Sequence, residues 1–524
     1  MNLVRALAST VRHHGPRPAM LDSSRSYSWS EFGARVARAA GMLVKLGVAP
    51  GRRFGILSRN GFRYEELKWA GFWLGAIPVP VNFRLAPSEI AQILDDGQCV
   101  HVMVENAFAA MLEHPALGNW RSRITLFGES AGDNAAAYES LLAEASPVAA
   151  GDPDADADAL LLYTGGTTGR SKGVRLSHTN ILSNNLAFGL AVGARPEHVY
   201  LHAAPMFHSA DLLAMGWFLQ GAAQCFLPMF SPPAFLEAIA HFRVGAVVTV
   251  PTMLIGTVSF ANFASADLSS LRVLIYGAAP MPVEWVERVA GAFPDVELFN
   301  CYGLTETAPD LTIFNSREFR AAIDKMAATG ERGGPLLSVG KPNALNELRV
   351  VASDGTEAAR GEAGELIARG PNIMKGYHDR PDETRAALRD GWLHTGDVAR
   401  IDEEGYVYLL DRLKDMVITG GENVYSSEVE AVLHRHPAIA EAAIVGVPDA
   451  RLGERVTAVL VVRPGMQATA DEMASHCRAW LGGFKVPRRF VFVDQLPKSA
   501  MGKVLKAELR KAQVREPGIE HAQT

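Results

Sequence analysis

Y-T-G-G-T-T-G-R-S-K-G-V, from Tyr163 to Val174, is the stretch around which the rest of the chain is organised. The apolar run Ala159 to Leu162 precedes it and predicts a buried strand that leads into a glycine-rich turn. Successive backbone N–H groups in such a turn form a concave site for anions. Threonine and serine hydroxyls add donors and Lys172 adds a positive charge, so this loop predicts the grip of a polyphosphate.

The spacing of this loop differs from the two commonest phosphate motifs. Walker A places lysine directly after glycine, whereas Arg170 and Ser171 separate Gly169 from Lys172 here. The dinucleotide fingerprint G-x-G-x-x-G does not fit either. A flexible surface loop would share the glycine, serine and threonine content. The lysine, the density of hydroxyls and the preceding strand favour phosphate binding.

Length and composition indicate a globular protein of several domains. The 524 residues are too many for one compact core, so two or more domains are expected. The hydrophobic fraction of 48% and the charged fraction of 21% are typical of soluble globular proteins. A net charge of −6 implies no general attraction to nucleic acid, so an anionic substrate must be held by a local positive site. Four scattered cysteines form neither a metal pattern nor a disulfide framework, which favours a reducing, cytoplasmic location.

Neither a signal peptide nor a membrane span is expected. Residues 1–14 lack a long apolar core and predict a short amphipathic helix. The most apolar window, Val244 to Val258, contains Pro251 and is too short to cross a bilayer. Peripheral membrane association and a homodimeric state are left open.

The order of elements predicts doubly wound α/β structure, in which strands and helices alternate. In the first 150 residues, helices are expected at Ser30–Leu46, with Ser30 as N-cap, and at Ala86–Asp95, and strands at Arg53–Leu57, Ala76–Val81 and Cys99–Val104. From 180 to 310, buried strands are expected at Val244–Val250, Val273–Tyr276 and Glu297–Asn300. Ligands bind where such strands end.

The last third of the chain predicts a small β subdomain and then a small α+β domain. The β-rich strands are Glu347–Val351, Gly364–Ala368 and Gly405–Leu410. The α+β strands are Ala442–Val447, Thr457–Val462 and Arg489–Val493. Ser427 and Glu430 have capping-box spacing, which predicts the start of a helix. We expect the domain boundary at 411/412, which divides residues 1–411 from residues 412–524.

Four further motifs follow the glycine-rich loop. They are N-C-Y-G-L-T-E-T-A at Asn300–Ala308, G-W-L-H-T-G-D at Gly391–Asp397, D-R-L-K-D at Asp411–Asp415 and P-K-S-A-M-G-K at Pro497–Lys503. Each alone has an ordinary explanation, such as a solvated carboxylate or an exposed loop lysine. In this order, they closely resemble the motif series of the AMP-forming adenylate synthetases, which include acyl-CoA synthetases, peptide-synthetase adenylation domains and firefly luciferase. The resemblance runs from P-V-N-F-R-L at Pro80–Leu85 to Lys503, and the motif sequences are most similar to those of fatty-acid or aryl-acid CoA ligases.

The resemblance implies a large N-terminal domain of two doubly wound α/β subdomains plus a small β-barrel, and a smaller mobile α+β C-terminal domain. It also implies ATP, Mg²⁺ and CoA as cofactors and co-substrates. The loop would close over the β- and γ-phosphates through Thr164, Gly165, Gly166, Thr167, Thr168, Gly169 and Lys172. Gly277, Ala278 and Ala279 would line the adenine pocket, completed by Asn300 and Tyr302. Asp397 would accept both ribose hydroxyls, and Arg412 would also reach the ribose.

The catalytic roles follow from the same resemblance. Thr305 would hydrogen-bond the α-phosphate, and Glu306 would help to hold Mg²⁺, a hard cation that prefers oxygen ligands. The acid's carboxylate would attack the α-phosphorus while Lys503 stabilises the charge that accumulates there. Because the carboxylate is already a nucleophile, no Ser-His-Asp triad is required.

The second half-reaction would be attack by a thiol on the acyl adenylate after the small domain rotates about Lys414. Gly421, in G-G-E-N, would then line the pantetheine tunnel, and this motif favours CoA as the acceptor. His208, in A-P-M-F-H-S-A-D, resembles the family's gate between acyl pocket and CoA tunnel. Asp211 either contacts a polar substrate group or caps the apolar helix that begins at Leu212, and we favour the cap.

Three positions depart from the usual family pattern without removing a charged catalytic group. Ser171 and Ser426 stand where proline is common, and Ser499 stands for threonine. We therefore expect activity as an ATP-dependent acid–CoA ligase. An acyl-adenylate ligase that loads a carrier protein is disfavoured because only about twenty residues follow Lys503. Luciferase chemistry and a non-catalytic nucleotide-binding protein are the remaining alternatives.

The acid itself is inferred from three segments expected to line its pocket. They are Met206–Met215, Ile275–Ala279 and Cys301–Pro309, and they are mostly apolar. An apolar lining suits a fatty acid, or an aryl acid such as a benzoate or hydroxycinnamate. We favour a fatty or similar hydrophobic acid.

Overall fold

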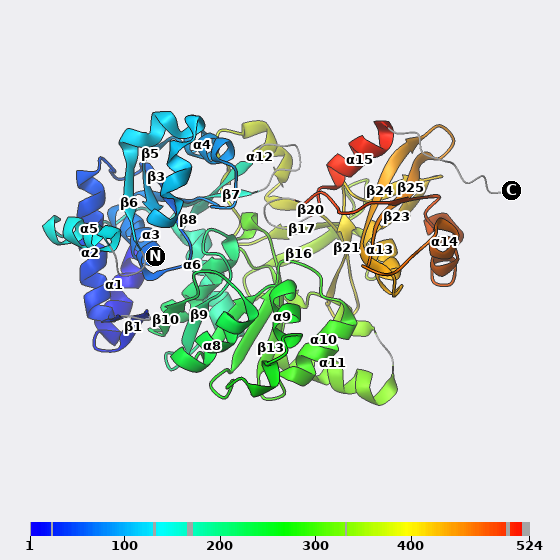
Figure 1. Cartoon of the computed structure of the whole chain (residues 1–524), viewed down its shortest axis with the longest axis horizontal. Coiled ribbons are helices and arrows are strands. Elements are labelled where there is room, and N and C mark those ends of the chain that lie inside the picture. The colour runs from blue at the N-terminus through cyan, green and yellow to red at the C-terminus, as the bar shows by residue number, and fades with distance from the viewer. Residues whose placement is uncertain are drawn as a thin grey trace. The chain divides into compact units, whose positions relative to one another are not determined.

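The computed structural model describes residues 2–22, 25–128, 133–164, 171–330, 333–498 and 504–515. The chain divides into two compact units (Figure 1). The N-terminal unit comprises Met1–Leu348 and Ala368–Leu393, and the C-terminal unit comprises Arg349–Ile367 and His394–Thr524.

The largest sheet of the N-terminal unit has the strand order β15-β14-β13-β12-β11-β9-β10-β1-β2. Strands β13 to β1 in this order run parallel, and the antiparallel strands β14, β15 and β2 lie at the two ends. Leu274 and Ile275 are adjacent and both fully buried, as expected for a parallel strand that is covered on both faces. The strands are β1 Pro18–Leu21, β2 Ser26–Ser28, β9 Val199–His202, β10 Ala223–Phe226, β11 Ala246–Thr249, β12 Val273–Gly277, β13 Glu297–Tyr302, β14 Thr312–Phe314 and β15 Lys341–Pro342.

A second, all-parallel sheet has the order β4-β3-β5-β6. Its strands are β3 Arg53–Leu57, β4 Ile77–Pro80, β5 Cys99–Glu105 and β6 Ile124–Phe127. Phe54 and Ile56 pack with helices α2 (Trp29–Lys45), α3 (Phe62–Leu74) and α5 (Asp133–Glu144), whereas Leu57 on the other face packs with α4 (Pro87–Asp96). Because successive strand residues point to opposite faces, this sheet is doubly wound as predicted.

A three-stranded antiparallel sheet carries the glycine-rich loop. Its order is β18-β8-β7, with β7 Asp158–Thr164, β8 Lys172–Ser177 and β18 Gly376–Tyr377. Residues 160–162 are buried, which confirms that an apolar strand precedes the loop.

The helices of the N-terminal unit cover these sheets. They are α1 Leu3–His14, α2 Trp29–Lys45, α3 Phe62–Leu74, α4 Pro87–Asp96, α5 Asp133–Glu144, α6 His178–Ala191, α7 Met215–Phe218, α8 Pro232–Phe242, α9 Pro251–Val258, α10 Val283–Ala292, α11 Ser316–Thr329 and α12 Pro381–Ala387. Short 3₁₀ segments include η1 Asn106–Glu113, η2 Pro115–Arg123, η3 Ser209–Ala214, η4 Phe263–Ser265, η5 Thr305–Thr307 and η6 Gly334–Leu337. Among the described residues, no helix combines the length and apolarity needed to cross a bilayer.

The C-terminal unit contains a sheet of order β23-β22-β25-β24, with β26 parallel to β25. One face packs against α13 and α14, and the other face packs against α15. The elements are β22 Val417–Thr419, β23 Glu422–Val424, α13 Ser426–His434, β24 Ile439–Asp449, β25 Gly453–Val462, α14 Ala470–Arg478, η7 Gly483–Lys485, β26 Arg489–Phe492 and α15 Lys506–Arg515.

The strands expected before this domain are also present. They are β16 Glu347–Val351, β17 Gly364–Arg369 and β21 Val407–Arg412, and the same sheet holds two strands that were not predicted, β19 Leu388–Arg389 and β20 Trp392–Ile401. Strands β3 and β16 have the predicted bounds, and most others shift by one to three residues. Strand β11 is shorter than predicted, at Ala246–Thr249.

Helix α2 begins one residue earlier than predicted, and its N-cap is Ser28 rather than Ser30. Ser28 Oγ accepts from the backbone N–H of Glu31, and Glu31 Oε2 accepts from the backbone N–H of Ser28 at 2.7 Å. Trp29 is then the first helical residue, and its side chain is fully buried. The complete capping box and the burial of Trp29 together fix this start.

The predicted capping box of Ser427 and Glu430 is wrong, although a helix does begin at Ser426. Ser427 Oγ donates to the carbonyl of Leu410. Glu430 Oε1 instead accepts from the backbone N–H of Ile444 at 2.7 Å and pairs with Lys506. Tertiary contacts therefore take both side chains away from the helix start.

Asp310 is a buried carboxyl that lacks a cationic partner among the described residues. Its Oδ2 accepts from Asn343 Nδ2 at 3.0 Å, whereas its Oδ1 has no donor within the described part of the chain. Burial raises the pKa of Asp310 to about 8, because the hydrogen bond from Asn343 offsets little of the desolvation. The folded protein therefore holds this carboxyl in its neutral form near pH 7.

Replacing the N-cap serine tests the observed start of α2. We expect Ser28→Ala to lower the free energy of unfolding by about 1 kcal/mol, because the donor at Glu31 loses its cap. The measurement is the midpoint of urea denaturation followed by tryptophan fluorescence. Ser30→Ala is the matched control, and an equal or larger loss there would restore the sequence-based assignment.

The neutral carboxyl of Asp310 predicts a pH-dependent stability. An unfolded aspartate ionises near pH 3.8, whereas the folded one stays protonated to about pH 8. The folded state thus binds the extra proton in this window, so stability falls as the pH rises through it. Relative to Asp310→Asn, the wild type should lose about 1.4 kcal/mol per pH unit between about pH 5 and 7.

Thermal or urea unfolding of both proteins at several pH values measures this difference. Asp295→Asn, at an exposed aspartate, is the control for replacing an aspartate by asparagine. Parallel profiles for Asp310→Asn and the wild type would show that Asp310 is ionised in the folded protein.

Candidate functional site

The β7–β8 hairpin brings the two ends of the glycine-rich loop together. Thr164 lies directly opposite Lys172 in the antiparallel register. Upstream, the Tyr163 hydroxyl donates to Asp96 at 2.7 Å. Burial and this hydrogen bond raise the pKa of Tyr163 well above its usual value, so the phenol remains a donor. The predicted phosphate contacts Gly165, Gly166, Thr167, Thr168 and Gly169 lie outside the described residues.

Tyr377 contacts both Lys172 and Glu306, the first through its ring and the second through its hydroxyl. Lys172 pairs with Glu383, and its Nζ lies 5.0 Å from the centroid of the Tyr377 ring. The Tyr377 hydroxyl donates to Glu306 Oε1 at 2.8 Å. The backbone N–H of Met374 donates to the carbonyl of Glu306 at 2.8 Å, which fixes the backbone there as well. The structure therefore places the predicted phosphate and magnesium residues close together.

Glu306 has the chemistry of a ligand for a hard cation. It is half-buried, and among the described residues nothing donates to its second carboxylate oxygen, Oε2. Oxygen donors of this kind suit Mg²⁺. The hydrogen bond from Tyr377 orients the carboxylate, as a group behind a metal ligand commonly does. Glu306 therefore fits the predicted role.

Thr305 links this cluster to the segment that carries His208. Its Oγ1 donates to Ser209 Oγ at 3.3 Å. His208 is half-buried and is the N-cap of η3, where its Nδ1 accepts from the backbone N–H of Ala210 at 3.4 Å. Three predicted catalytic residues, Thr305, Glu306 and His208, thus lie on two adjoining segments.

The predicted adenine segment follows β12 at the carboxyl edge of the large sheet. Gly277 lies opposite Cys301 of β13, and a Cβ there would come within 2.4 Å of the Cys301 carbonyl oxygen. Ala278 has φ +66°, and both Ala278 and Ala279 are exposed. Two parallel strands end here side by side, which is where an open α/β sheet binds ligands.

The other two adenine-pocket residues are on β13. Asn300 is half-buried, and its Nδ2 donates to the carbonyl of Ser338 at 3.3 Å. Tyr302 is buried at the end of the same strand. Asn300 lies opposite Tyr276 in the register, one residue before Gly277. These residues therefore share the strand edge with Gly277.

Asp211 is neither an N-cap nor available to a substrate. It lies within η3, and its buried carboxylate binds Lys68 Nζ at 2.9 Å and His202 Nδ1 at 2.5 Å. Burial alone would raise the pKa of Asp211, but Lys68 and His202 outweigh it and lower the pKa. The predicted cap is therefore wrong, because the buried side chains of Lys68 and His202 both bind this carboxylate.

In the C-terminal unit, Asp397 lies directly across the β20–β21 ladder from Arg412. Arg412 Nε donates to Asp397 Oδ1 at 2.8 Å, and its Nη1 donates to the carbonyl of Thr395 at 3.2 Å. Asp397 is 6% exposed. The structure brings together the two residues predicted to bind the ribose.

Lys414 and Gly421 lie in the two turns that follow. The carbonyl of Lys414 accepts from Arg510 Nη2 at 3.0 Å, and its side chain is exposed. Gly421 has φ +85° in the turn between β22 and β23, and a Cβ there would meet nothing within 4 Å. The left-handed backbone alone thus favours glycine at 421. Lys503 lies outside the described residues.

Ser426 uses the groups that proline would lack at this position. Its backbone N–H and its Oγ both donate to the Asp411 carboxylate, at 2.5 and 3.0 Å. Lys506 Nζ in turn donates to Ser426 Oγ at 2.6 Å. The departure from the usual family residue therefore creates a polar contact next to Arg412.

Sequence reasoning missed Tyr377, Lys68 and His202. Tyr377 follows a glycine in a two-residue strand, and no spacing marks it as part of the phosphate site. Lys68 lies in helix α3 together with Arg63, Glu65 and Glu66, and four charged residues in a helix rich in aromatic residues were the signal of buried charge pairs.

Two family models match the chain. The AMP-binding enzyme model matches residues 7–378, and the AMP-binding enzyme C-terminal domain model matches residues 428–503. A feruloyl-CoA synthase from an Amycolatopsis species is 36% identical over 506 residues, which are 96% of this chain and 96% of that protein. The fatty acid–[acyl-carrier-protein] ligase ScoC of Streptomyces coeruleorubidus is 31% identical over 97% of this chain and 96% of its own.

A solved structure shows the same fold. ATP-bound MatB from Rhodopseudomonas palustris superposes with a TM-score of 0.86 at 30% identity, covering 98% of this chain and 99% of that one. The family models, the relatives and the fold agree with the motif series. The chain belongs to the AMP-binding enzyme family.

Proposed function

We propose that the protein is an ATP-dependent carboxylic acid–CoA ligase. The observation that carries the proposal is the convergence of Lys172, Tyr377, Glu306 and Thr305, which come from three separate segments. This arrangement provides a cation, an anionic oxygen ligand and a hydroxyl donor in one place. Phosphoryl and adenylyl transfer require such groups.

In the first half-reaction, a carboxylate oxygen of the acid attacks the α-phosphorus of ATP, and the bond to pyrophosphate breaks. Lys172 and the loop from Thr164 hold the departing pyrophosphate. Thr305 positions the α-phosphate, and Lys503 stabilises the charge that develops there. Bound Mg²⁺, held by Glu306, would neutralise phosphate oxygens.

We assign one set of residues to the adenine of the nucleoside and another to its ribose. Gly277, Ala278 and Ala279 pack against adenine, with Asn300 and Tyr302 beside them. Asp397 accepts hydrogen bonds from the ribose hydroxyls, and Arg412 holds Asp397 in place. The 2.8 Å contact between the two side chains supports this assignment.

In the second half-reaction, the thiol of CoA attacks the carbonyl carbon of the acyl adenylate. A carbon–sulfur bond forms, the bond from the carbonyl carbon to the phosphate oxygen breaks, AMP leaves, and the thiol proton is released to solvent. We place the mobile domain at residues 412–524 with its hinge at Lys414, Gly421 along the thiol's path and His208 as the gate. The match of a C-terminal domain model to residues 428–503 supports this division.

The acid is a hydrophobic monocarboxylic acid, either fatty or aryl. The segment 206–215 is dominated by buried apolar side chains, which supports this class. The relative at 36% identity is named for an aryl acid, feruloyl, and the one at 31% for a fatty acid. The aryl acid is therefore kept as the second candidate.

One assay tests the function and the choice of acid. The purified protein is given ATP, Mg²⁺, CoA and one acid from a series of fatty acids, benzoate or ferulate, and AMP and acyl-CoA are measured by chromatography. We expect AMP formation that depends on both acid and CoA, with one class preferred by at least ~10-fold in kcat/KM. AMP formation that required a phosphopantetheinylated carrier protein instead of CoA would contradict the proposal.

Separating the half-reactions tests Lys503. We expect Lys503→Ala to slow acid-dependent pyrophosphate release by ~10²–10³-fold, because one preorganised charge is lost from the transition state. Thioester formation from supplied acyl adenylate should largely persist. Lys498→Ala is the matched control, since this nearby lysine pairs with Glu441 and has no assigned role. Equal loss of both steps in Lys503→Ala would refute the assigned role.

A further inference from the structure

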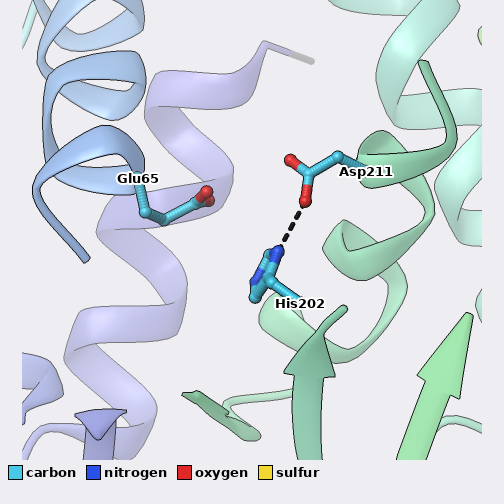
Figure 2. Close-up of side chains that lie close together, drawn as sticks. All are labelled: Glu65, His202 and Asp211. Atoms are coloured by element: carbon cyan, nitrogen blue, oxygen red, sulfur yellow. Dashed lines mark hydrogen bonds and ion pairs between the residues drawn. The ribbon is translucent and has the colours of Figure 1, made fainter. Parts of the chain in front are cut away.

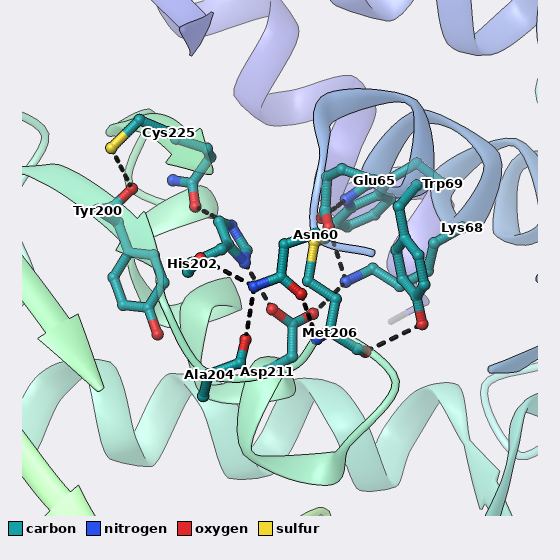
Figure 3. A network of polar contacts seen from close by, with 12 residues as sticks. Asn60, Glu65, Lys68, Trp69, Tyr200, His202, Ala204, Met206, Asp211 and Cys225 are labelled. Carbon is teal, nitrogen blue, oxygen red and sulfur yellow. Dashed lines mark hydrogen bonds and ion pairs between the residues drawn. The ribbon is translucent and has the colours of Figure 1, made fainter. Parts of the chain in front are cut away.

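Helix α3 buries charged side chains that the proposed chemistry does not use. Arg63, Glu65, Glu66 and Lys68 are all 3% exposed or less. Buried charges are costly unless they are paired. Arg63 and Glu66 join a network with Arg35, Glu139 and Tyr138 on one side of the helix. Glu65 and Lys68 belong to a second network that includes Asp211 and His202 (Figure 3).

Lys68 bridges the two carboxylates of this second network. Its Nζ lies 2.8 Å from Glu65 Oε2 and 2.9 Å from Asp211 Oδ2. Trp69 Nε1 donates to the other oxygen of Glu65 at 2.7 Å. The pKa of Lys68 is raised because its two carboxylate partners outweigh the effect of burial. Lys68 is therefore a full positive charge.

The same residues resemble a metal site, because ligand atoms of Glu65, His202 and Asp211 lie within 4.8 Å of one another (Figure 2). The three come from α3, the end of β9 and η3. The Lys68 ammonium already contacts both carboxylates, so it supplies the positive charge that a metal ion would otherwise provide. We therefore assign no metal to this cluster.

Hydrogen-bond complementarity shows that His202 completes the charge balance. Gln224 Nε2 donates to the carbonyl of Ala222 at 2.8 Å, so its Oε1 is the atom that faces His202 Nε2 at 3.1 Å. His202 Nδ1 faces Asp211 Oδ1. Both ring nitrogens thus face acceptors, and both must donate. Two cations and two anions make the cluster neutral overall.

Further polar atoms just before and within α3 hold the segment that leads to His208. Asn60 Nδ2 donates to the carbonyls of His202 and Ala204, at 3.0 and 2.9 Å. Asn60 Oδ1 accepts from the backbone N–H of Met206 at 2.8 Å, and the Tyr64 hydroxyl donates to the Met206 carbonyl at 2.9 Å. His208 lies between these contacts and the anchor at Asp211.

We propose that Lys68, with Asn60 and Tyr64, is a positioning residue that sets the place of His208 by anchoring residues 202–211 at both ends. The proposal rests on the proposed function only in the role given to His208. Lys68 is buried, with 3% of its surface exposed, and we assign it no contact with the substrate. It acts through Asp211, which lies three residues after His208 and cannot move without separating two buried charges.

Charge balance provides variants that separate positioning from folding. Lys68→Met leaves two anions and one cation buried, so it should lower Tm strongly whatever its effect on His208. Glu65→Gln/Lys68→Met removes one charge of each sign and should return Tm close to the wild-type value. The anchor between α3 and Asp211 is nevertheless lost in this double variant. We expect its kcat/KM for the CoA-dependent step to fall by on the order of 10-fold to 100-fold.

Tyr64→Phe and Tyr138→Phe form a matched pair. Both tyrosines are fully buried and both hydroxyls donate a hydrogen bond next to α3, but only Tyr64 contacts the His208 segment. We expect Tyr64→Phe to lower kcat/KM for the CoA-dependent step and Tyr138→Phe to leave it unchanged. Equal kinetic effects in the two variants would overturn the proposal.

A double-mutant cycle with His208→Ala tests whether Lys68 acts through His208. If it does, His208→Ala should cost much less in the Glu65→Gln/Lys68→Met background than in the wild type. Multiplicative losses would overturn the proposal, as would full recovery of kcat/KM together with Tm in the double variant.

Hydrogen–deuterium exchange gives a readout that needs no activity. Peptides that cover residues 203–211 should exchange faster in Glu65→Gln/Lys68→Met than in the wild type, while peptides of α8 should not change. Unchanged exchange at 203–211 would overturn the positioning role. If the wild type makes no AMP from any acid, the proposed function fails, and this exchange result still decides the positioning role.

Discussion

The pairing of β18 with β8 is the constraint on which the candidate phosphate site depends. Tyr377 lies opposite Val174 in this pairing, and Val174 is two residues after Lys172. Its ring face is near Lys172 Nζ, and its hydroxyl is bound to Glu306. A cation over an aromatic ring and a charge-assisted hydrogen bond are both directional interactions. One side chain therefore holds a positive and a negative group in fixed places, although they come from segments far apart in the sequence.

The N-terminal unit meets the cost of buried charge in two different ways. Around Lys68, Lys68 and His202 contact the carboxylates of Glu65 and Asp211, so the opposite charges balance. Among the described residues, the Asp310 carboxyl accepts a hydrogen bond from the Asn343 amide alone, and burial keeps it neutral near pH 7. The first solution makes a rigid anchor, because moving any member separates opposite charges in a low-dielectric interior. The second makes the stability of the unit depend on pH.

The sequence predicted the alternation of strands and helices well, because hydrophobic periodicity and turn residues reflect interactions between residues that are close in sequence. Strands β3 and β16 have the predicted bounds for this reason. The caps were predicted less well, since Ser427 and Glu430 have partners that are distant in sequence. The structure places Thr305, Glu306 and Lys172, which the resemblance assigned to one site, in one neighbourhood. The resemblance could not reveal Tyr377 or Lys68, because their roles depend on which strand or segment each one meets in space.

The pairing of Asp211 also bears on how the acid is selected. With its carboxylate held by Lys68 and His202, this residue offers no charge to a substrate. The rest of the 206–215 segment is largely apolar, with Phe207, Leu212 and Met215 buried. A hydrophobic pocket discriminates by size and shape, and one methylene is worth only ~1–3 kcal/mol. Selection by such a lining would therefore be graded, so related acids of similar width should compete.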